Sequence, residues 1–126
     1  MINMVKKKIM VVDDEESIVE LVKAIMESEE YEVVTAMDGN ECLEKLKTVK
    51  PDLIILDMMM PGMSGREVCE KIRENPKTKN LKVAFLTVAK FSETGKGVLK
   101  EMKVLDYITK PFENQDLVRR VKKLVS

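Results

Sequence analysis

Five short apolar runs rich in β-branched residues recur along the chain, and turn residues such as Asp38-Gly39 and Pro61-Gly62 separate them. Runs of this length and composition predict β-strands. The expected strands are Ile9–Val12, Tyr31–Thr35, Leu53–Leu56, Val83–Leu86 and Tyr107–Thr109.

The segments between these runs have the spacing of helices with one apolar face. The pattern is clearest at Ile18, Leu21, Val22, Ile25 and Met26, and it recurs over residues 117–125. Ser17 with Glu20, and Ser64 with Glu67, have the spacing of a capping box, which predicts helix starts at both places.

The segment Phe91–Met102 is the weakest of the expected helices. Its two glycines, Gly95 and Gly97, each cost about 1 kcal/mol relative to alanine inside a helix. We therefore expect it to be the most mobile element of the chain.

Strands that alternate with helices imply right-handed crossovers and a mostly parallel sheet with helices on both faces. The chain has 126 residues, which is enough for one globular core and too few for two ordinary domains. We expect one α/β domain over residues 1–126.

Charge and composition exclude several classes of protein. Lys+Arg and Asp+Glu both number 22, so the balance favours neither nucleic acid nor an anionic membrane as partner. The first residues lack a secretory signal and the apolar runs are short, which predicts a cytoplasmic protein.

Cys42 and Cys69 have no metal-ligand spacing and are expected to be buried thiols. The chain has no histidine, so a phosphoryl donor has to be another molecule.

Reactive side chains follow four of the predicted strands. Asp13-Asp14 follow the first, Asp57 the third, Thr87 the fourth and Lys110 the fifth. Parallel strands end at one edge of a sheet, where ligands of open α/β sheets bind. Three carboxylates there repel one another unless a hard divalent cation lies between them, and Mg²⁺ suits oxygen ligands and phosphate.

An aspartate in such a pocket can attack a phosphoryl group, provided that the incoming negative charge is neutralised. Mg²⁺ and Lys110 would neutralise that charge, and the Thr87 hydroxyl would add a hydrogen bond. Asp57 is the expected nucleophile, because it follows the strand expected at the centre of the sheet.

The motifs at these positions resemble those of receiver domains in two-component response regulators, particularly the single-domain chemotaxis type. The match runs from about Lys8 to Leu124, in the same order and spacing. The matching stretches are Val11–Glu15, Leu56–Gly65, Leu86-Thr87 and Tyr107–Phe112.

The resemblance implies a flavodoxin-like fold, with five parallel strands in the order 2-1-3-4-5 and five helices on both faces. It implies that Asp57 is the phosphoacceptor, and that Asp13, Asp14, Asp57 and the main-chain carbonyl of Met59 bind Mg²⁺. It further implies a cis Lys110-Pro111 peptide.

The resemblance also implies how the protein works. Phosphorylation by a histidine kinase or phosphotransfer protein would move Thr87 and Tyr107, changing the surface of the fourth helix, fifth strand and fifth helix for a downstream protein. We expect a stand-alone regulator that is a monomer or weak dimer. Beyond its own phosphorylation and slow dephosphorylation, no enzymatic activity is expected.

Two positions depart from the family pattern: Val88 is bulkier than usual, and Lys103–Asp106 lacks a glycine often found there.

Several alternatives stay open. Asp13-Asp14 could simply cap the first helix, and Tyr107 could be a core aromatic residue. Lysines near the fourth helix (Lys96, Lys100, Lys103) and the bases of the fifth (Arg119, Arg120, Lys122, Lys123) form a solvated surface or a docking face for an acidic partner.

Two other functions can be weighed against the receiver hypothesis. An aspartyl-nucleophile phosphatase of the haloacid-dehalogenase kind needs two aspartates separated by one residue, whereas Asp13 and Asp14 are adjacent. A flavin-binding loop would be rich in glycine and hydroxyl groups, whereas the loop here reads Asp-Asp-Glu-Glu.

Overall fold

The structure, a computed structural model, describes residues 5–88, 97 and 100–126. Five parallel strands form one sheet in the order β2-β1-β3-β4-β5, which confirms the expected fold. The strands are β1 (Lys8–Val12), β2 (Glu32–Ala36), β3 (Leu53–Leu56), β4 (Val83–Thr87) and β5 (Asp106–Thr109).

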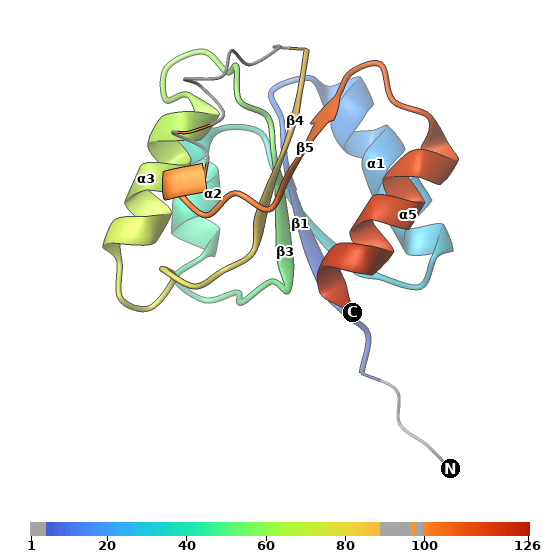
Figure 1. Cartoon of the computed structure of the whole chain (residues 1–126), viewed down its shortest axis with the longest axis horizontal. Helices are drawn as coiled ribbons and strands as arrows, with labels where there is room; N and C mark the ends of the chain where they lie inside the picture. The colour runs from blue at the N-terminus through green and yellow to red at the C-terminus, as the bar shows by residue number, and fades with distance from the viewer. Residues whose placement is uncertain (1–4, 89–96, 98–99) are drawn as a thin grey trace.

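Helices cover both faces of this sheet (Figure 1). α1 (Glu16–Ser28) and α5 (Asn114–Val125) lie on one face, and α2 (Gly39–Lys45) and α3 (Gly65–Glu74) lie on the other. These are the four helices whose bounds lie within the described residues, and residues 97, 100 and 101 are helical as well. The predicted weak and mobile helix over Phe91–Met102 falls largely on residues 89–96 and 98–99, which lie outside the described residues.

The two faces have separate cores, because alternate residues of a strand point to opposite sides. On the α1/α5 side, Ile9 and Val11 of β1 pack with Val22, Met26 and Leu117. On the α2/α3 side, Met10 and Val12 pack with a second group of buried residues: Cys42, Val68, Cys69 and Ile72. Both cysteines are buried free thiols, as predicted.

The helix starts only partly follow the prediction. Ser64 caps α3 and accepts a hydrogen bond from the Glu67 N–H at 3.2 Å, as expected. The capping box at Ser17 is wrong, because α1 begins at Glu16 and Ser17 lies inside the helix. The N-cap residue of α1 is Glu15, which makes no side-chain capping hydrogen bond within the described residues, and its N–H donates to Asp13 Oδ1 at 2.9 Å in the turn before the helix.

No helix in the described part of the chain combines the length and the apolar composition needed to cross a membrane.

The strand bounds differ from the predicted ones by a residue at several ends. Tyr31 precedes β2, and Thr87 is the last residue of β4 and does not follow it. These small shifts leave the functional side chains at the same edge of the sheet.

Candidate phosphoacceptor and metal site

Three aspartates meet at the carboxyl edge of the central strands. Asp13 and Asp14 follow β1, and Asp57 follows β3, which is the neighbour of β1 in the sheet. One carboxylate oxygen from each lies within 4.8 Å of the other two. Asp13 and Asp57 are buried, whereas Asp14 is exposed. Two of the three acids are therefore buried at the base of the site, and the third lies at its solvent-exposed rim.

Main-chain hydrogen bonds fix these aspartates. The Asp57 N–H donates to the Val12 carbonyl at 2.8 Å, and the Asp13 N–H donates to Ala36 at 3.2 Å. Both bonds continue the ladders between neighbouring strands one residue past the strand ends. The two buried carboxylates are therefore held by the sheet and not by a free loop.

Lys110 follows β5 and reaches into the same pocket. Its Nζ lies 2.6 Å from Asp13 Oδ2, 3.4 Å from Glu15 Oε1 and 3.7 Å from Asp57 Oδ2, and its side chain is buried. The Lys110 main-chain N–H donates to the Thr87 carbonyl at 2.9 Å, so β4 positions the turn that carries the lysine. The Lys110-Pro111 peptide is cis, as predicted.

The pKa values reflect this crowding. Burial raises the pKa of the Asp57 carboxyl to about 6, the nearby Asp13 charge adds to that rise, and the Met59 N–H and Lys110 oppose it. Burial alone would lower the pKa of Lys110, but hydrogen bonding to Asp13 and the surrounding carboxylates raise it overall. The pocket thus brings several carboxyl groups and one amine together in a partly desolvated setting.

The donor set fits a hard divalent cation. Carboxylate oxygens are the ligands that Mg²⁺ prefers, and a cation among them relieves their mutual repulsion. Asp13, Asp14 and Asp57 could hold Mg²⁺ together. The Met59 N–H donates to Asp57 Oδ1 at 3.2 Å, and the Met59 side chain is exposed beside the site. The ligand role of the Met59 carbonyl stays a prediction.

A glycine permits the close packing behind Asp57. A Cβ atom on Gly65 would lie 2.2 Å from the Asp57 carbonyl oxygen, a distance that no side chain tolerates. The Gly65 N–H also donates to the Met58 carbonyl at 2.9 Å. The first turn of α3 can therefore lie directly against the end of β3 only with glycine there.

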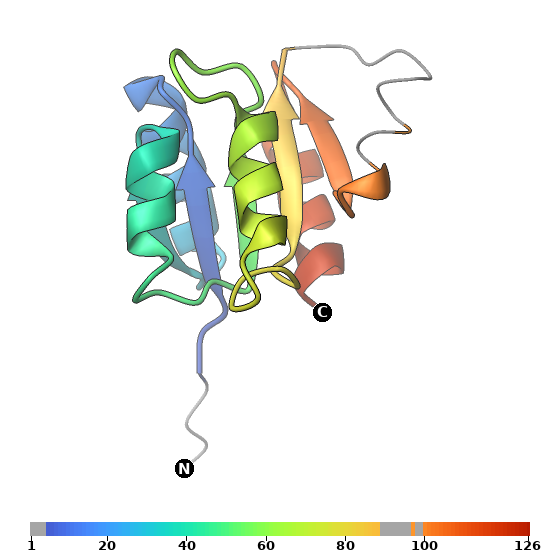
Figure 2. The ribbon, with the colours of Figure 1, turned by 90° about the vertical axis from the view of Figure 1, so that its left-hand side faces the viewer.

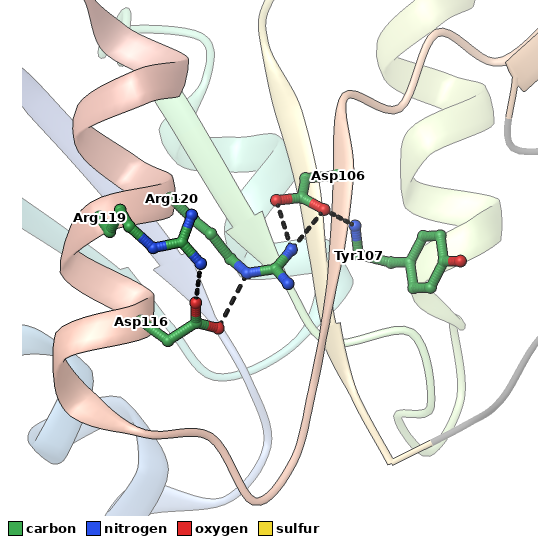
Figure 3. A network of polar contacts seen from close by, with 5 residues as sticks. All are labelled: Asp106, Tyr107, Asp116, Arg119 and Arg120. Atoms are coloured by element: carbon green, nitrogen blue, oxygen red, sulfur yellow. Dashed lines mark hydrogen bonds and ion pairs between the residues drawn. The ribbon is translucent and has the colours of Figure 1, made fainter.

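Thr87 and Tyr107 lie on neighbouring strands. Thr87 is fully buried at the end of β4, and Tyr107 is opposite Phe85 in the β4–β5 register. Tyr107 is half-buried and packs against the core on the α2/α3 side. Figure 3 shows its ring on the opposite side of β5 from Asp106, whose carboxylate points toward α5. The position suits both a core aromatic residue and a movable one, so the switch role stays a prediction.

The bases of α5 are largely neutralised within the molecule (Figure 3). Arg120 Nη1 lies 2.8 Å from Asp106 Oδ1, and Arg120 Nε lies 2.9 Å from Asp116 Oδ2. Arg119 also pairs with Asp116, and Lys122 pairs with Glu29 at 2.9 Å. These pairs favour the solvated-surface interpretation of the basic face on α5. Lys96, on the same predicted face, lies outside the described residues.

Glu15 was missed as a neighbour of the site, although it follows the aspartate pair directly. Its carboxylate contacts Lys110, and a third acid at the same strand end was the available signal.

Comparisons with known proteins agree with this geometry. The family model of the response regulator receiver domain matches residues 9–122. The transcriptional regulatory protein PhoP for alkaline phosphatase synthesis, from Bacillus subtilis, is 44% identical over 119 residues. That alignment covers 94% of this chain and 48% of PhoP, so the chain spans about half the length of that curated relative.

Solved structures give the same result. Chemotaxis protein CheY4 of Vibrio cholerae superposes with a TM-score of 0.88 at 31% identity, covering 95% of this chain and 99% of CheY4. TrrA of Thermotoga maritima, solved in complex with Mg(2+)-BeF, has a TM-score of 0.79 at 41% identity, covering 94% and 98% of the two chains. The chain therefore belongs to the response regulator receiver domain family.

Proposed function

We propose that this receiver domain accepts a phosphoryl group on Asp57, with Mg²⁺ bound beside it, from a histidine kinase or a phosphotransfer protein. The observation that carries the proposal is the convergence of Asp13, Asp14, Asp57 and Lys110 in one pocket. Asp57 is the buried carboxylate at the end of β3, next to β1 on one side and β4 on the other.

The proposed chemistry needs an ionised Asp57. A carboxylate oxygen attacks the phosphorus, a new O–P bond forms, and the bond from phosphorus to the donor breaks with its electron pair leaving on the donor. With its pKa at about 6, Asp57 is mostly ionised at neutral pH and is more basic than an ordinary aspartate. Bound Mg²⁺ would favour the ionised form further, because a positive charge beside a carboxylate stabilises it.

The other residues would neutralise and orient the incoming group. When bound, Mg²⁺ supplies positive charge to the phosphoryl oxygens. Asp13, Asp14, Asp57 and the Met59 carbonyl are the proposed ligands. Lys110, already 3.7 Å from Asp57, would pair with a phosphoryl oxygen, and the Thr87 hydroxyl would hydrogen-bond to another. The similar protein TrrA was solved in complex with Mg(2+)-BeF, and beryllium fluoride mimics a phosphoryl group, which supports the proposal that this receiver takes both Mg²⁺ and a phosphoryl group.

The experiment is phosphorylation by a small acyl phosphate, followed by intact-protein mass spectrometry. We expect a mass gain of one phosphoryl group with Mg²⁺ and none with a chelator. Asp57→Asn should abolish the gain. Asp52→Asn, the same change just before β3, should behave like wild type, because the Asp52 carboxylate accepts from the Lys8 N–H at the other end of the strand. Equal labelling of Asp57→Asn and wild type would overturn the proposal.

We further propose that Thr87 and Tyr107 transmit the phosphorylated state to the surface formed by β5, α5 and the helix predicted over Phe91–Met102. A downstream protein would bind at this surface. Fluorotyrosine labelling tests this, because the chain has two tyrosines and Tyr31, next to α1, serves as an internal control. Beryllium fluoride with Mg²⁺ should shift the ¹⁹F resonance of Tyr107 and leave that of Tyr31 in place. No shift at Tyr107 would contradict the switch role.

The similarity to PhoP from Bacillus subtilis favours a second candidate function, the control of transcription. A receiver 44% identical to that of a transcriptional regulatory protein could control transcription through further parts of a longer protein. Binding of the phosphorylated chain to a protein target, compared with an effect on promoter activity, separates the two outputs.

A further inference from the structure

The loop between α3 and β4, residues 75–82, lies at the end of the sheet opposite the acidic pocket (Figure 2). It carries three exposed lysines, Lys77, Lys79 and Lys82. In the part of the chain that the structure describes, none of the three forms an ion pair. The bases of α5 contrast with them, since Arg119, Arg120 and Lys122 are paired with acids. A chain with no net charge thus gathers three lysines on one loop.

The main chain of the loop is held in place by its own hydrogen bonds. Asn75 Oδ1 accepts from the Lys77 N–H at 2.9 Å, and the Thr78 hydroxyl donates to the Ile72 carbonyl at 2.7 Å. The Lys79 N–H donates to the Asn75 carbonyl at 2.8 Å. The lysines therefore project from an ordered backbone, which lowers the entropy that a partner would have to remove.

Arg73 of α3 ties this loop to the segment before β5. Its guanidinium donates to the carbonyls of Lys79 and Leu81 at 3.0 and 2.7 Å, and to those of Met102 and Lys103 at 2.7 and 3.2 Å. The geometry brings Lys103 beside the loop and leaves Arg73 committed to main-chain acceptors. Arg73 is thus a scaffold of this surface and not a ligand-binding side chain.

Two hollows flank the loop, and each has leucines in its lining and lysines around them. The hollow on the α2 side, about 330 Å³, is lined by Leu43, Leu46, Lys47, Lys71 and Lys77 together with loop residues. Lys47 also pairs with the exposed Glu44 at 2.9 Å. Among the residues that the structure describes, no carboxylate lines this hollow.

The hollow on the β5 side, about 150 Å³, is lined by Leu81, Leu105, Lys79, Lys82 and Lys103, and the described part of the chain places no carboxylate in its lining. Lys82 Nζ also donates to the Leu124 carbonyl at 2.7 Å. A neighbouring hollow of about 540 Å³ on α3 shares Lys79 and Lys103 with the hollow on the β5 side and also contains three acids, Glu70, Glu74 and Glu101, so the surface carries both signs of charge on this side.

We propose that the α3–β4 loop and its two flanking hollows form a docking surface for an acidic protein segment that carries apolar side chains. Carboxylates of the partner would pair with the lysines, and its apolar side chains would enter the leucine-lined hollows. Nucleic acid fits less well, because neither hollow is lined by an aromatic residue for base stacking and the Arg73 guanidinium is occupied.

Binding of a synthetic peptide tests this surface. The probe is a fluorescein-labelled peptide in which leucines alternate with pairs of glutamates, titrated at low ionic strength with chelator and without a phosphoryl donor. These conditions make the result independent of Asp57. Lys77→Glu/Lys79→Glu should weaken binding by about tenfold or more. Lys23→Glu/Lys123→Glu, an equal charge change at exposed positions on α1 and α5, should stay within about twofold of wild type.

Two further peptides separate the contributions. Replacing the leucines by serine should weaken binding by roughly tenfold, since the hollows would lose their apolar contacts. Replacing the glutamates by lysine should abolish binding. Equal affinity of the two double variants, no loss with serine, or tighter binding of a single-stranded oligonucleotide than of the acidic peptide would each overturn the proposal.

Discussion

The Lys110 ammonium nitrogen lies 2.6 Å from Asp13 Oδ2 and 3.7 Å from Asp57 Oδ2. In this state the lysine pairs most closely with a proposed metal ligand, and the proposed phosphoacceptor is its more distant partner. A phosphoryl group on Asp57 would bring new oxygens toward the same ammonium. Lys110 can therefore balance the acidic pocket before phosphorylation and contact the phosphoryl group after it.

Removing the Lys110 charge should destabilise the fold. Lys110→Met keeps the apolar stem but leaves Asp13 and Asp57 as a buried pair of like charges, with an expected loss of about 2 to 4 kcal/mol in the free energy of unfolding. Urea unfolding in chelator measures this loss, and added Mg²⁺ should recover part of it. Lys47→Met, at an exposed ion pair with Glu44, should cost less than about 0.5 kcal/mol. Similar losses for the two variants would show that Lys110 does not balance the pocket.

Asp57→Asn should stabilise the metal-free protein at neutral pH. The folded-state pKa of about 6 lies above the ordinary value of 3.8, so an ionised Asp57 opposes folding. The penalty is absent below about pH 4, where the carboxyl is protonated in both states, and complete above about pH 7. We expect a gain of about 1 to 3 kcal/mol near pH 8 that disappears toward pH 4. A gain in stability that does not change with pH would show that ionisation of Asp57 is not its cause.

Mg²⁺ should stabilise the folded protein through the three aspartates. A ligand that binds only the native state raises its stability with concentration, so the thermal midpoint should rise on addition of Mg²⁺. Asp14→Asn should remove most of this rise, because Asp14 is the exposed member of the cluster and forms no ion pair among the described residues. Glu20→Gln, an exposed change on α1, should keep the full rise. An unchanged response in Asp14→Asn would exclude that carboxylate as a ligand.

Lys103→Gly should stabilise the chain. Lys103 has φ of +59°, in the left-handed region where glycine has no steric penalty, and it occupies the segment in which the expected family glycine is missing. Substitution should add about 0.5 to 1 kcal/mol to the free energy of unfolding. Lys100→Gly, three residues earlier and helical, should cost about 1 kcal/mol. Destabilisation by both changes would show that the backbone at residue 103 is not strained.

The sheet and the site were predictable because they depend on periodicity and on strand ends. The apolar runs gave the five strands within about a residue, and the position of Asp13, Asp57 and Lys110 after those strands placed them together. The misplaced helix start at Ser17 shows the limit, since the chain already enters the helix after Glu15, whose N–H donates to Asp13 in the preceding turn. The Arg73 hydrogen bonds were invisible in the sequence, because they join main-chain carbonyls of residues far apart along the chain.

The central claim is that Asp57 carries the phosphoryl group, and reductive trapping tests it most directly. After reaction with an acyl phosphate and Mg²⁺, borohydride converts an aspartyl phosphate to homoserine, which peptide mass spectrometry locates. The account predicts homoserine at position 57 and unmodified aspartate at positions 13 and 14. Homoserine at position 13 or 14, or at none of the three, would contradict it.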